Sequence, residues 1–170
     1  RKILIEPDPF LRQVSHNVEK VDDELRNLMD DMLETMYAAP GIGLAAVQVG
    51  IPKRVIVIDL SKEEEKKPLY FVNPKIILKS DSNATYEEGC LSVPGQFAEI
   101  DRPDKCHVNY LDYNGKQQEI KAEGLLATCI QHEIDHLEGI LFIDYLSKLK
   151  KNYIVKKLSK QKKILERIVV

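Results

Sequence analysis

Two histidines and a glutamate stand together in the chain, in the order His132, Glu133 and, three residues later, His136. On a helix, residues four apart lie on one face about a turn from each other, so both imidazoles can bind the same metal ion. The glutamate beside the first histidine can then reach a metal-bound water and act as a general base. The pattern therefore predicts a hydrolytic metal centre carried by a helix.

A catalytic site of this type needs a third protein ligand and an open fourth position. Metalloproteases with this motif take the third ligand from a Glu or His further along the chain, but no histidine follows His136. The acids that follow are Glu138, Asp144 and Glu166. The first is too near on the same helix, the second lies in the next segment and the third is in the basic tail, so none is well placed.

Cysteines are the remaining candidates for the third ligand. Cys129 shares a helical face with both histidines, but its short thiol would have to reach about a turn along the helix axis. We therefore interpret Cys129, together with Leu125 on the same stripe, as the wall of a pocket. Cys90 follows Gly89, which permits close approach of the backbone, and its thiolate would complete a Cys-His-His set. Spacing alone makes Cys90 the best of several options.

A glycine-rich stretch, GIGLAAVQVG over residues 41–50, fits the G-x-G-x-x-A fingerprint that binds a dinucleotide pyrophosphate. That fingerprint needs a strand before its first glycine and a helix across its last position. Here an apolar stripe from Leu25 to Met36 predicts an amphipathic helix before the loop, and Pro52 ends any helix after it. We reject the dinucleotide hypothesis and expect the loop to bring bare backbone and the amide of Gln48 to a different ligand.

The elements that must position these residues indicate an α+β fold. The expected strands cover residues 54–60, 69–72, 75–78, 106–111 and 117–121. Asn114-Gly115 between the last two is the strongest short hairpin signal. Without βαβ alternation, we expect antiparallel β-sheets and hairpins packed around a central HExxH helix over residues 125–137, with an N-terminal amphipathic helix and a C-terminal helix. One domain over residues 1–170 accommodates them, and residues 147–170 form the basic C-terminal helix.

The composition is that of an ordinary globular protein, with 44% apolar and 31% charged residues and no apolar run of membrane-spanning length. Three cysteines without a closely spaced pair indicate a reducing compartment rather than a disulfide framework. The net charge of −2 is uneven, because residues 147–170 carry +8 and the rest of the chain carries −10. Such a tail is either a solvated helix face or a contact for a polyanion, and we favour the solvated face on charge alone.

Three blocks taken together are far more specific than any one of them. They are GIGLAAVQ at residues 41–48, EGCLS at residues 88–92 and QHEIDH at residues 131–136. With these blocks in this order, the chain resembles the peptide deformylase family, whose members remove the N-formyl group from the initiator methionine of new bacterial and organellar proteins. The similarity covers essentially the whole chain, and the C-terminal helix makes it similar to the bacterial type.

Carried over to this sequence, the resemblance implies one divalent metal ion per chain. Its ligands would be Cys90, His132 and His136, with a water in the fourth place. Glu133 would be the general acid and base, and the developing oxyanion would be held by the amide of Gln48 and the backbone N–H of Leu91. The resemblance implies Fe²⁺ as the metal in vivo, with Zn²⁺, Ni²⁺ or Co²⁺ able to replace it, because a thiolate and two imidazoles suit all four.

The implied substrates are N-formylmethionyl peptides and nascent chains. Gly41 and Gly43 would let the backbone from Ile42 to Leu44 pair with an extended peptide, with Gly89 on the opposite side. The expected pocket for the methionine side chain is formed by Ile42, Tyr86, Leu125, Thr128 and Cys129. Phe97 stands where many relatives have an arginine near the pocket mouth.

The expected partners and location follow from the same resemblance. The basic tail would dock on the ribosome surface, and the enzyme would be a monomer without membrane contact, in the bacterial cytoplasm or as a mature organellar form. Two other classes of protein are weighed against this one. An HExxH metalloprotease would cut internal peptide bonds, and a noncatalytic binding module would close its metal site with four protein ligands.

Overall fold

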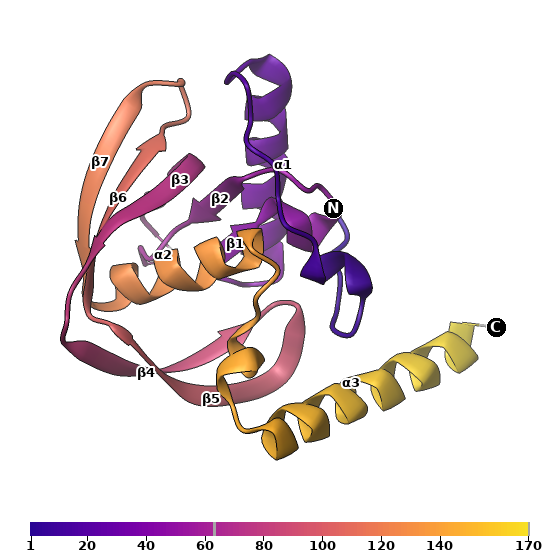
Figure 1. The fold of residues 1–170 in the computed structure, drawn as a ribbon. Helices are drawn as coiled ribbons and strands as arrows, with labels where there is room; N and C mark the ends of the chain where they lie inside the picture. The colour runs from indigo at the N-terminus through magenta and orange to yellow at the C-terminus, as the bar shows by residue number, and fades with distance from the viewer. Residues whose placement is uncertain (63, 170) are drawn as a thin grey trace.

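The computed structural model describes residues 1–62 and 64–169, and its core is a five-stranded antiparallel sheet. In spatial order its strands are β1 (Gly43–Ala45), β2 (Val55–Ile58), β3 (Leu69–Lys79), β6 (Lys105–Leu111) and β7 (Gln117–Glu123). A separate hairpin pairs β4 (Asn83–Cys90) with β5 (Val93–Pro103). Helix α2 (Gly124–Leu137) contacts both the sheet and the hairpin and lies between them (Figure 1). The expected α+β arrangement around a central HExxH helix is confirmed.

Helix α1 (Asp23–Ala38) is the predicted N-terminal amphipathic helix. Asp22 caps it, because its side chain accepts a hydrogen bond from the backbone N–H of Leu25 at 2.9 Å. The apolar stripe is buried except for Leu33, which is partly buried, and it packs against β1 and β2. After the helix ends, the N–H of Gly41 bonds to the carbonyl of Met36 at 2.7 Å, which fixes where the glycine loop begins.

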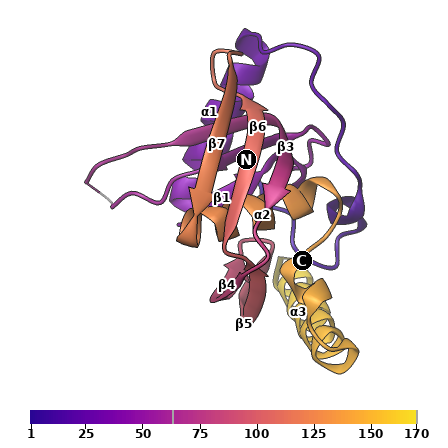
Figure 2. The same cartoon turned by 60° about the vertical axis from the view of Figure 1, so that its left-hand side comes forward.

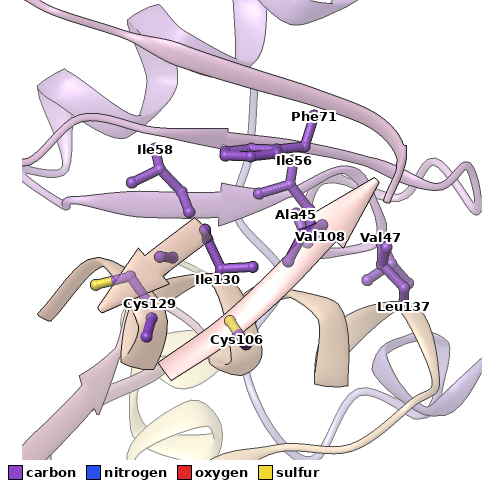
Figure 3. Packing of buried hydrophobic residues seen from close by; sticks show 12 residues of the cluster. Ala45, Val47, Ile56, Ile58, Phe71, Cys106, Val108, Cys129, Ile130 and Leu137 are labelled. Atoms are coloured by element: carbon purple, nitrogen blue, oxygen red, sulfur yellow. The ribbon is translucent and has the colours of Figure 1, made fainter. Parts of the chain in front are cut away.

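The main apolar cluster joins the sheet to α2. Ile56, Ile58 and Phe71 from the sheet meet Ile130 and Leu137 from the helix, as the close view shows (Figure 3). Each of these side chains is almost completely buried, and burying one stabilises the fold by about 1.5–3 kcal/mol. One face of α2 is therefore committed to the core, and the histidine face turns to the hairpin.

The strands differ from the sequence prediction in three places: β1 was not predicted, β3 is longer than predicted, and the β4–β5 hairpin was missed. The two short strands expected around Pro74 are one strand, β3, which bends through register shifts between Val72 and Lys75 and between Ile76 and Leu78. Asn73 takes a positive φ of 50° at the first bend, and its amide bonds the backbone N–H and carbonyl of Val18, both at 2.8 Å. This side-chain anchor lets the strand pass the proline without ending.

The β4–β5 hairpin was not among the predicted strands. Its inner face carries the buried ion pair of Glu88 and Arg102, and these charged residues interrupt the alternation of apolar and polar positions on which strand prediction depends. The hairpin of β6 and β7, in contrast, lies where Asn114-Gly115 predicted it.

Helix α3 (Lys148–Val169) leaves the body of the molecule, as the yellow end of the ribbon shows (Figure 1). Its first half is held by Ile154 and Leu158, which pack into an apolar cluster with residues of β5 and of the short helix η3 (Phe142–Tyr145). The hairpin and α3 consequently share one end of the molecule (Figure 2). Residues 160–167 are all exposed. Among the described helices, none has both the length and the apolar character needed to cross a membrane.

Candidate metal centre and its cavity

Three side chains converge in a group that could hold a metal ion: Cys90, His132 and His136. Their possible ligand atoms all lie within 4.8 Å of one another, and the Sγ of Cys90 is 3.3 Å from the Nε2 of His136. Cys90 ends strand β4, and both histidines lie on the face of α2 that meets the hairpin. The fold thus brings together the three residues that the motifs of the sequence indicated as metal ligands.

The donor set and its surroundings fit a divalent transition metal. One thiolate and two imidazoles are a ligand set typical of Zn²⁺ and Fe²⁺ sites. The Nδ1 of His132 lies 2.9 Å from the carboxylate of Glu88, which leaves Nε2 free to bind an ion. Burial lowers the pKa of His136, so this imidazole is neutral and can donate its lone pair. Cys129 is not a member of the group.

Glu88 is itself fixed by Arg102. The guanidinium donates from Nε at 2.6 Å and from Nη2 at 2.9 Å to the two carboxylate oxygens. Burial opposes ionisation of Glu88, but the hydrogen bonds from His132 and Arg102 outweigh it and lower the pKa of the carboxyl. The resulting carboxylate holds the imidazole of His132 in one tautomer and one orientation, as such partners of metal ligands do.

Glu133 lies beside the metal ligands with its carboxyl almost completely buried. Burial raises the pKa of Glu133 to about 7, so the group can both accept and release a proton near neutral pH. A Cβ added to Gly43 would stand 2.5 Å from the Oε2 of Glu133, so only glycine leaves room for this carboxyl. The other oxygen, Oε1, is buried and has no hydrogen-bond partner among the described residues.

The side chain of Gln48 is oriented by its neighbours. Its Oε1 accepts a hydrogen bond from the N–H of Ala45 at 2.9 Å, and its Nε2 donates to the hydroxyl of Ser92 at 3.0 Å. The same Nε2 lies 3.5 Å from the Sγ of Cys90. Because the carbonyl end is occupied by Ala45, the amide must present its NH₂ to the metal group.

A cavity of about 580 Å³ opens in front of these residues. Among the residues expected to bind substrate, eight line it: Gly41, Ile42, Gly43, Tyr86, Gly89, Leu125, Thr128 and Cys129. It is also lined by Cys90, Leu91, His132 and Glu133. Cys90, His132, Glu133 and the apolar wall therefore face one common space, whereas His136 is completely buried and is not among the lining residues.

The side chain of Leu44 lies in the core under α1 and not at the cavity, and from the sequence only its backbone was expected to meet the peptide. It pairs with Val57 in the middle of β1, where the alternation of the strand turns it inward. Only its backbone remains available for the pairing expected of residues 42–44. Cys129 lines the cavity as expected, and burial raises the pKa of its thiol to about 12, so it is a neutral wall residue.

Some residues of the site were not found from the sequence. Ile3 and Ile5 line the cavity, although nothing in their local pattern indicates it. Ser92 and Glu88 lie inside the block EGCLS, and their closeness to Cys90 in the sequence is the signal that could have identified them as residues of the site. Phe97 also lines the cavity, is 64% exposed, and covers Gly89 so closely that a Cβ there would stand 2.5 Å from its ring.

Residues 1–152 match the family model described as polypeptide deformylase. The chain is 68% identical over 171 residues to the peptide deformylase of Pelagibacter ubique, covering 100% of this chain and 98% of that protein. It is 65% identical over 164 residues to that of Phenylobacterium zucineum, covering 96% and 97%.

A solved structure agrees with these relatives. The crystal structure of peptide deformylase from Ehrlichia chaffeensis superimposes with a TM-score of 0.91 at 47% identity, covering 96% of this chain and 97% of that one. The match therefore extends to the sheet, the hairpin and the HExxH helix that form the site. On its sequence and its fold together, the chain belongs to the peptide deformylase family.

Proposed function

We propose that this chain hydrolyses the formyl amide of N-formylmethionyl peptides and nascent chains, and releases formate and a free amino terminus. The observation that carries the proposal is the convergence of Cys90, His132 and His136 with the buried carboxyl of Glu133 at one apolar cavity. An HExxH metalloprotease with its third ligand further along the chain is not favoured, because the ligand group takes its third member from β4 instead.

We propose Cys90, His132 and His136 as the ligands of one divalent ion. When bound, such an ion supplies Lewis acidity at the formyl oxygen and makes water more acidic. We further propose Fe²⁺ as the ion in vivo on the strength of the family relationship, and the mixed thiolate and imidazole donors are compatible with it. Protein loaded with Fe²⁺ should then lose activity in air while protein loaded with Ni²⁺ keeps it, and equal lifetimes of the two forms would contradict the assignment.

Glu133 is the proton carrier of the proposed reaction. Its carboxylate takes a proton from the attacking water as oxygen bonds to the formyl carbon. The carboxyl then gives this proton to the amine nitrogen as the carbon–nitrogen bond breaks. The burial of the group and its unpartnered Oε1 support this role, since the carboxyl has capacity for one further hydrogen bond in the cavity.

The negative charge that develops on the formyl oxygen is held by the amide NH₂ of Gln48 and the backbone N–H of Leu91. The fixed orientation of the Gln48 amide supports this role, because a preorganised donor does not have to turn during the reaction. Such donors bind the tetrahedral intermediate better than the planar formyl group, which lowers the barrier.

The peptide lies as an extended strand between the loop of Gly41, Ile42 and Gly43 on one side and Gly89 on the other. Its main chain pairs with exposed backbone, in the manner of strand addition. The methionine side chain enters the apolar wall formed by Tyr86, Leu125, Thr128 and Cys129. The common cavity lined by these residues supports the arrangement.

Formate release from a formyl-Met peptide by anaerobically prepared, Fe²⁺-loaded protein is the test of this function. We expect turnover of the formylated peptide and none of the matched acetyl-Met peptide. Cleavage of an internal bond in either peptide would identify a metalloprotease, and absence of both reactions in metal-loaded protein would refute the proposal.

We also propose that α3 docks on the ribosome, so that the enzyme meets nascent chains in the bacterial cytoplasm. The exposed segment 160–167 is strongly basic, and the aromatic ring of Tyr153 is exposed on the same helix. Because the site is complete within one chain, the enzyme needs no second copy and would act as a monomer. Both the docking and the location rest on the tail charge and on the family relationship.

The docking test must spare the part of α3 that packs on the body. Removing residues 160–170 keeps Ile154 and Leu158 in their cluster. The truncated protein should co-sediment less with ribosomes, most clearly at low salt, while turnover of short formyl peptides stays unchanged. The charge reversal Lys75→Glu on β3, which leaves the tail intact, is the matched control. Equal co-sedimentation of full-length and truncated protein would show that the tail is only a solvated helix.

A further inference from the structure

The short helix η3 holds the metal ligand His132 from two directions. Phe142, at its start, stacks on the imidazole with 6.1 Å between ring centroids and 25° between the ring planes. Tyr145, at its end, donates its hydroxyl to the Oδ2 of Asp135 at 2.7 Å. Its ring lies 4.9 Å from the guanidinium carbon of Arg102. Both contacts of Tyr145 are made to residues outside the ligand group.

These contacts continue inward as a chain of charged hydrogen bonds. The same Oδ2 of Asp135 accepts from the Nη1 of Arg102 at 2.8 Å. Arg102 holds Glu88 through two bonds, and Glu88 holds the Nδ1 of His132 at 2.9 Å. Tyr145 is thus the outer end of a continuous path to the imidazole, built from η3, α2, β5 and β4 in turn.

Solvent can reach this path most easily at Asp135. The side chains of Arg102 and Glu88 are each only 5% exposed, whereas that of Asp135 is 20% exposed. An ion pair open to water is screened and contributes little, while a pair shielded from water is held more firmly. The hydroxyl and ring of Tyr145 cover this place, although Tyr145 itself is 51% exposed and contributes little to the core.

We propose that Tyr145 is a positioning residue for the metal ligand His132. It fixes the carboxylate of Asp135 and shields the guanidinium of Arg102, so that Glu88 keeps the imidazole in one orientation. The inference rests on the proposed function in taking His132 as a ligand. It adds a residue that touches neither metal nor substrate.

The test compares Tyr145→Ala and Tyr145→Phe with the parent protein, all loaded with Zn²⁺. The rate of metal release is measured with a colorimetric chelator in excess, and kcat and KM are measured with a formyl-Met peptide. Losing a partner of a metal ligand typically weakens metal binding or activity by about 10–100-fold. Tyr145 acts on His132 only through Asp135, Arg102 and Glu88, so we expect release from Tyr145→Ala to be faster by more than twofold and up to about tenfold, with lower kcat and nearly unchanged KM. Tyr145→Phe, which keeps the ring and loses only the hydroxyl, should lie between.

Two controls make the test specific. Tyr153→Ala removes an equally exposed tyrosine, 65% exposed on α3, and should leave both measurements unchanged. The thermal midpoint of each metal-free variant shows whether it is folded, and if Tyr145→Ala is not, Tyr145→Phe decides.

The proposal would be overturned if the folded Tyr145 variants released metal at a rate within twofold of the parent rate. It would also be overturned if Tyr153→Ala released metal as fast as Tyr145→Ala. The release measurement also separates it from the proposed function, since a protein that binds zinc but hydrolyses no formyl peptide still reports on Tyr145. A parent protein that binds no zinc would overturn the ligand assignment and this inference together.

Discussion

Replacing Gln48 by leucine tests the oxyanion role most directly, because the side chains are similar in size and only the amide is lost. In the parent protein this amide is 1% exposed and its Nε2 lies 3.5 Å from the Sγ of Cys90. Losing one oxyanion donor in other hydrolases lowers kcat by about 10²–10³, or about 2.7–4 kcal/mol. We expect a loss of this size in kcat and little change in KM, since the donor acts mainly on the intermediate.

The same substitution should also destabilise the fold. It leaves the buried N–H of Ala45 without its acceptor and the hydroxyl of Ser92 without its donor. A buried polar group without a partner costs about 1–3 kcal/mol. For a chain of this length, each kcal/mol lowers the melting temperature by about 2–4 °C, so we expect each of the two unpaired groups to lower it by roughly 2–12 °C.

The two effects are separated by measuring formate release well below the melting temperature of the variant. Metal content is measured on the same samples, so that a loss of the ion is not mistaken for a loss of the donor. Gln118→Leu makes the same chemical change on exposed strand β7 and serves as the control. If metal-loaded Gln48→Leu turns over the formyl peptide within a factor of about three of the parent, the proposal that the amide of Gln48 binds the oxyanion is refuted.

Three further predictions concern the ligand, the proton carrier and acid stability. Cys90→Ala should bind almost no metal by elemental analysis while Cys106→Ala, in the core, binds one ion per chain; equal metal content would remove Cys90 from the ligand set. Glu133→Gln should keep its metal and lose more activity than Gln48→Leu, and residual turnover near the parent value would contradict a proton carrier. Burial opposes ionisation of Asp59, but hydrogen bonds, including one from Tyr37, outweigh it and lower the pKa of this carboxyl. The ionised group therefore stabilises the fold fully above a pH of about 3.9, the pKa of an unfolded aspartate, and this stabilisation is lost as the pH falls further. Asp59→Asn should therefore show a weaker loss of urea resistance between about pH 4 and pH 2, and an unchanged pH slope would contradict this.

The helices and the β6–β7 hairpin could be predicted from the sequence because their signals are local. The 3.6-residue period of α1, its cap at Asp22 and the Asn114-Gly115 turn are each contained in a few consecutive residues. The two histidines of the HExxH motif, His132 and His136, could be identified for the same reason. The β4–β5 hairpin was missed, because the buried charged residues Glu88 and Arg102 interrupt the apolar pattern of its inner face.

The rest of the site depends on contacts between distant segments, which spacing cannot encode. Residue chemistry alone left Cys90 as one option among several, and only the docking of the hairpin on α2 brings it 3.3 Å from His136. Gly43 was expected to leave room for the backbone of the peptide, but the space that a Cβ of residue 43 would fill is also needed by the carboxyl of Glu133. The path from Tyr145 to His132 crosses four elements and has no signature in any one of them.

The division of the ligands between the hairpin and the helix has a consequence for how the enzyme matures. Cys90 precedes His136 by 46 residues, and neither β4 nor α2 alone carries all three proposed ligands. A chain whose hairpin has not yet docked can hold an ion only weakly through its two histidines, so tight capture must wait for nearly complete tertiary structure. On the proposed ligand set, metal uptake is therefore a late maturation step, and a newly made molecule would acquire its activity only after its architecture is assembled.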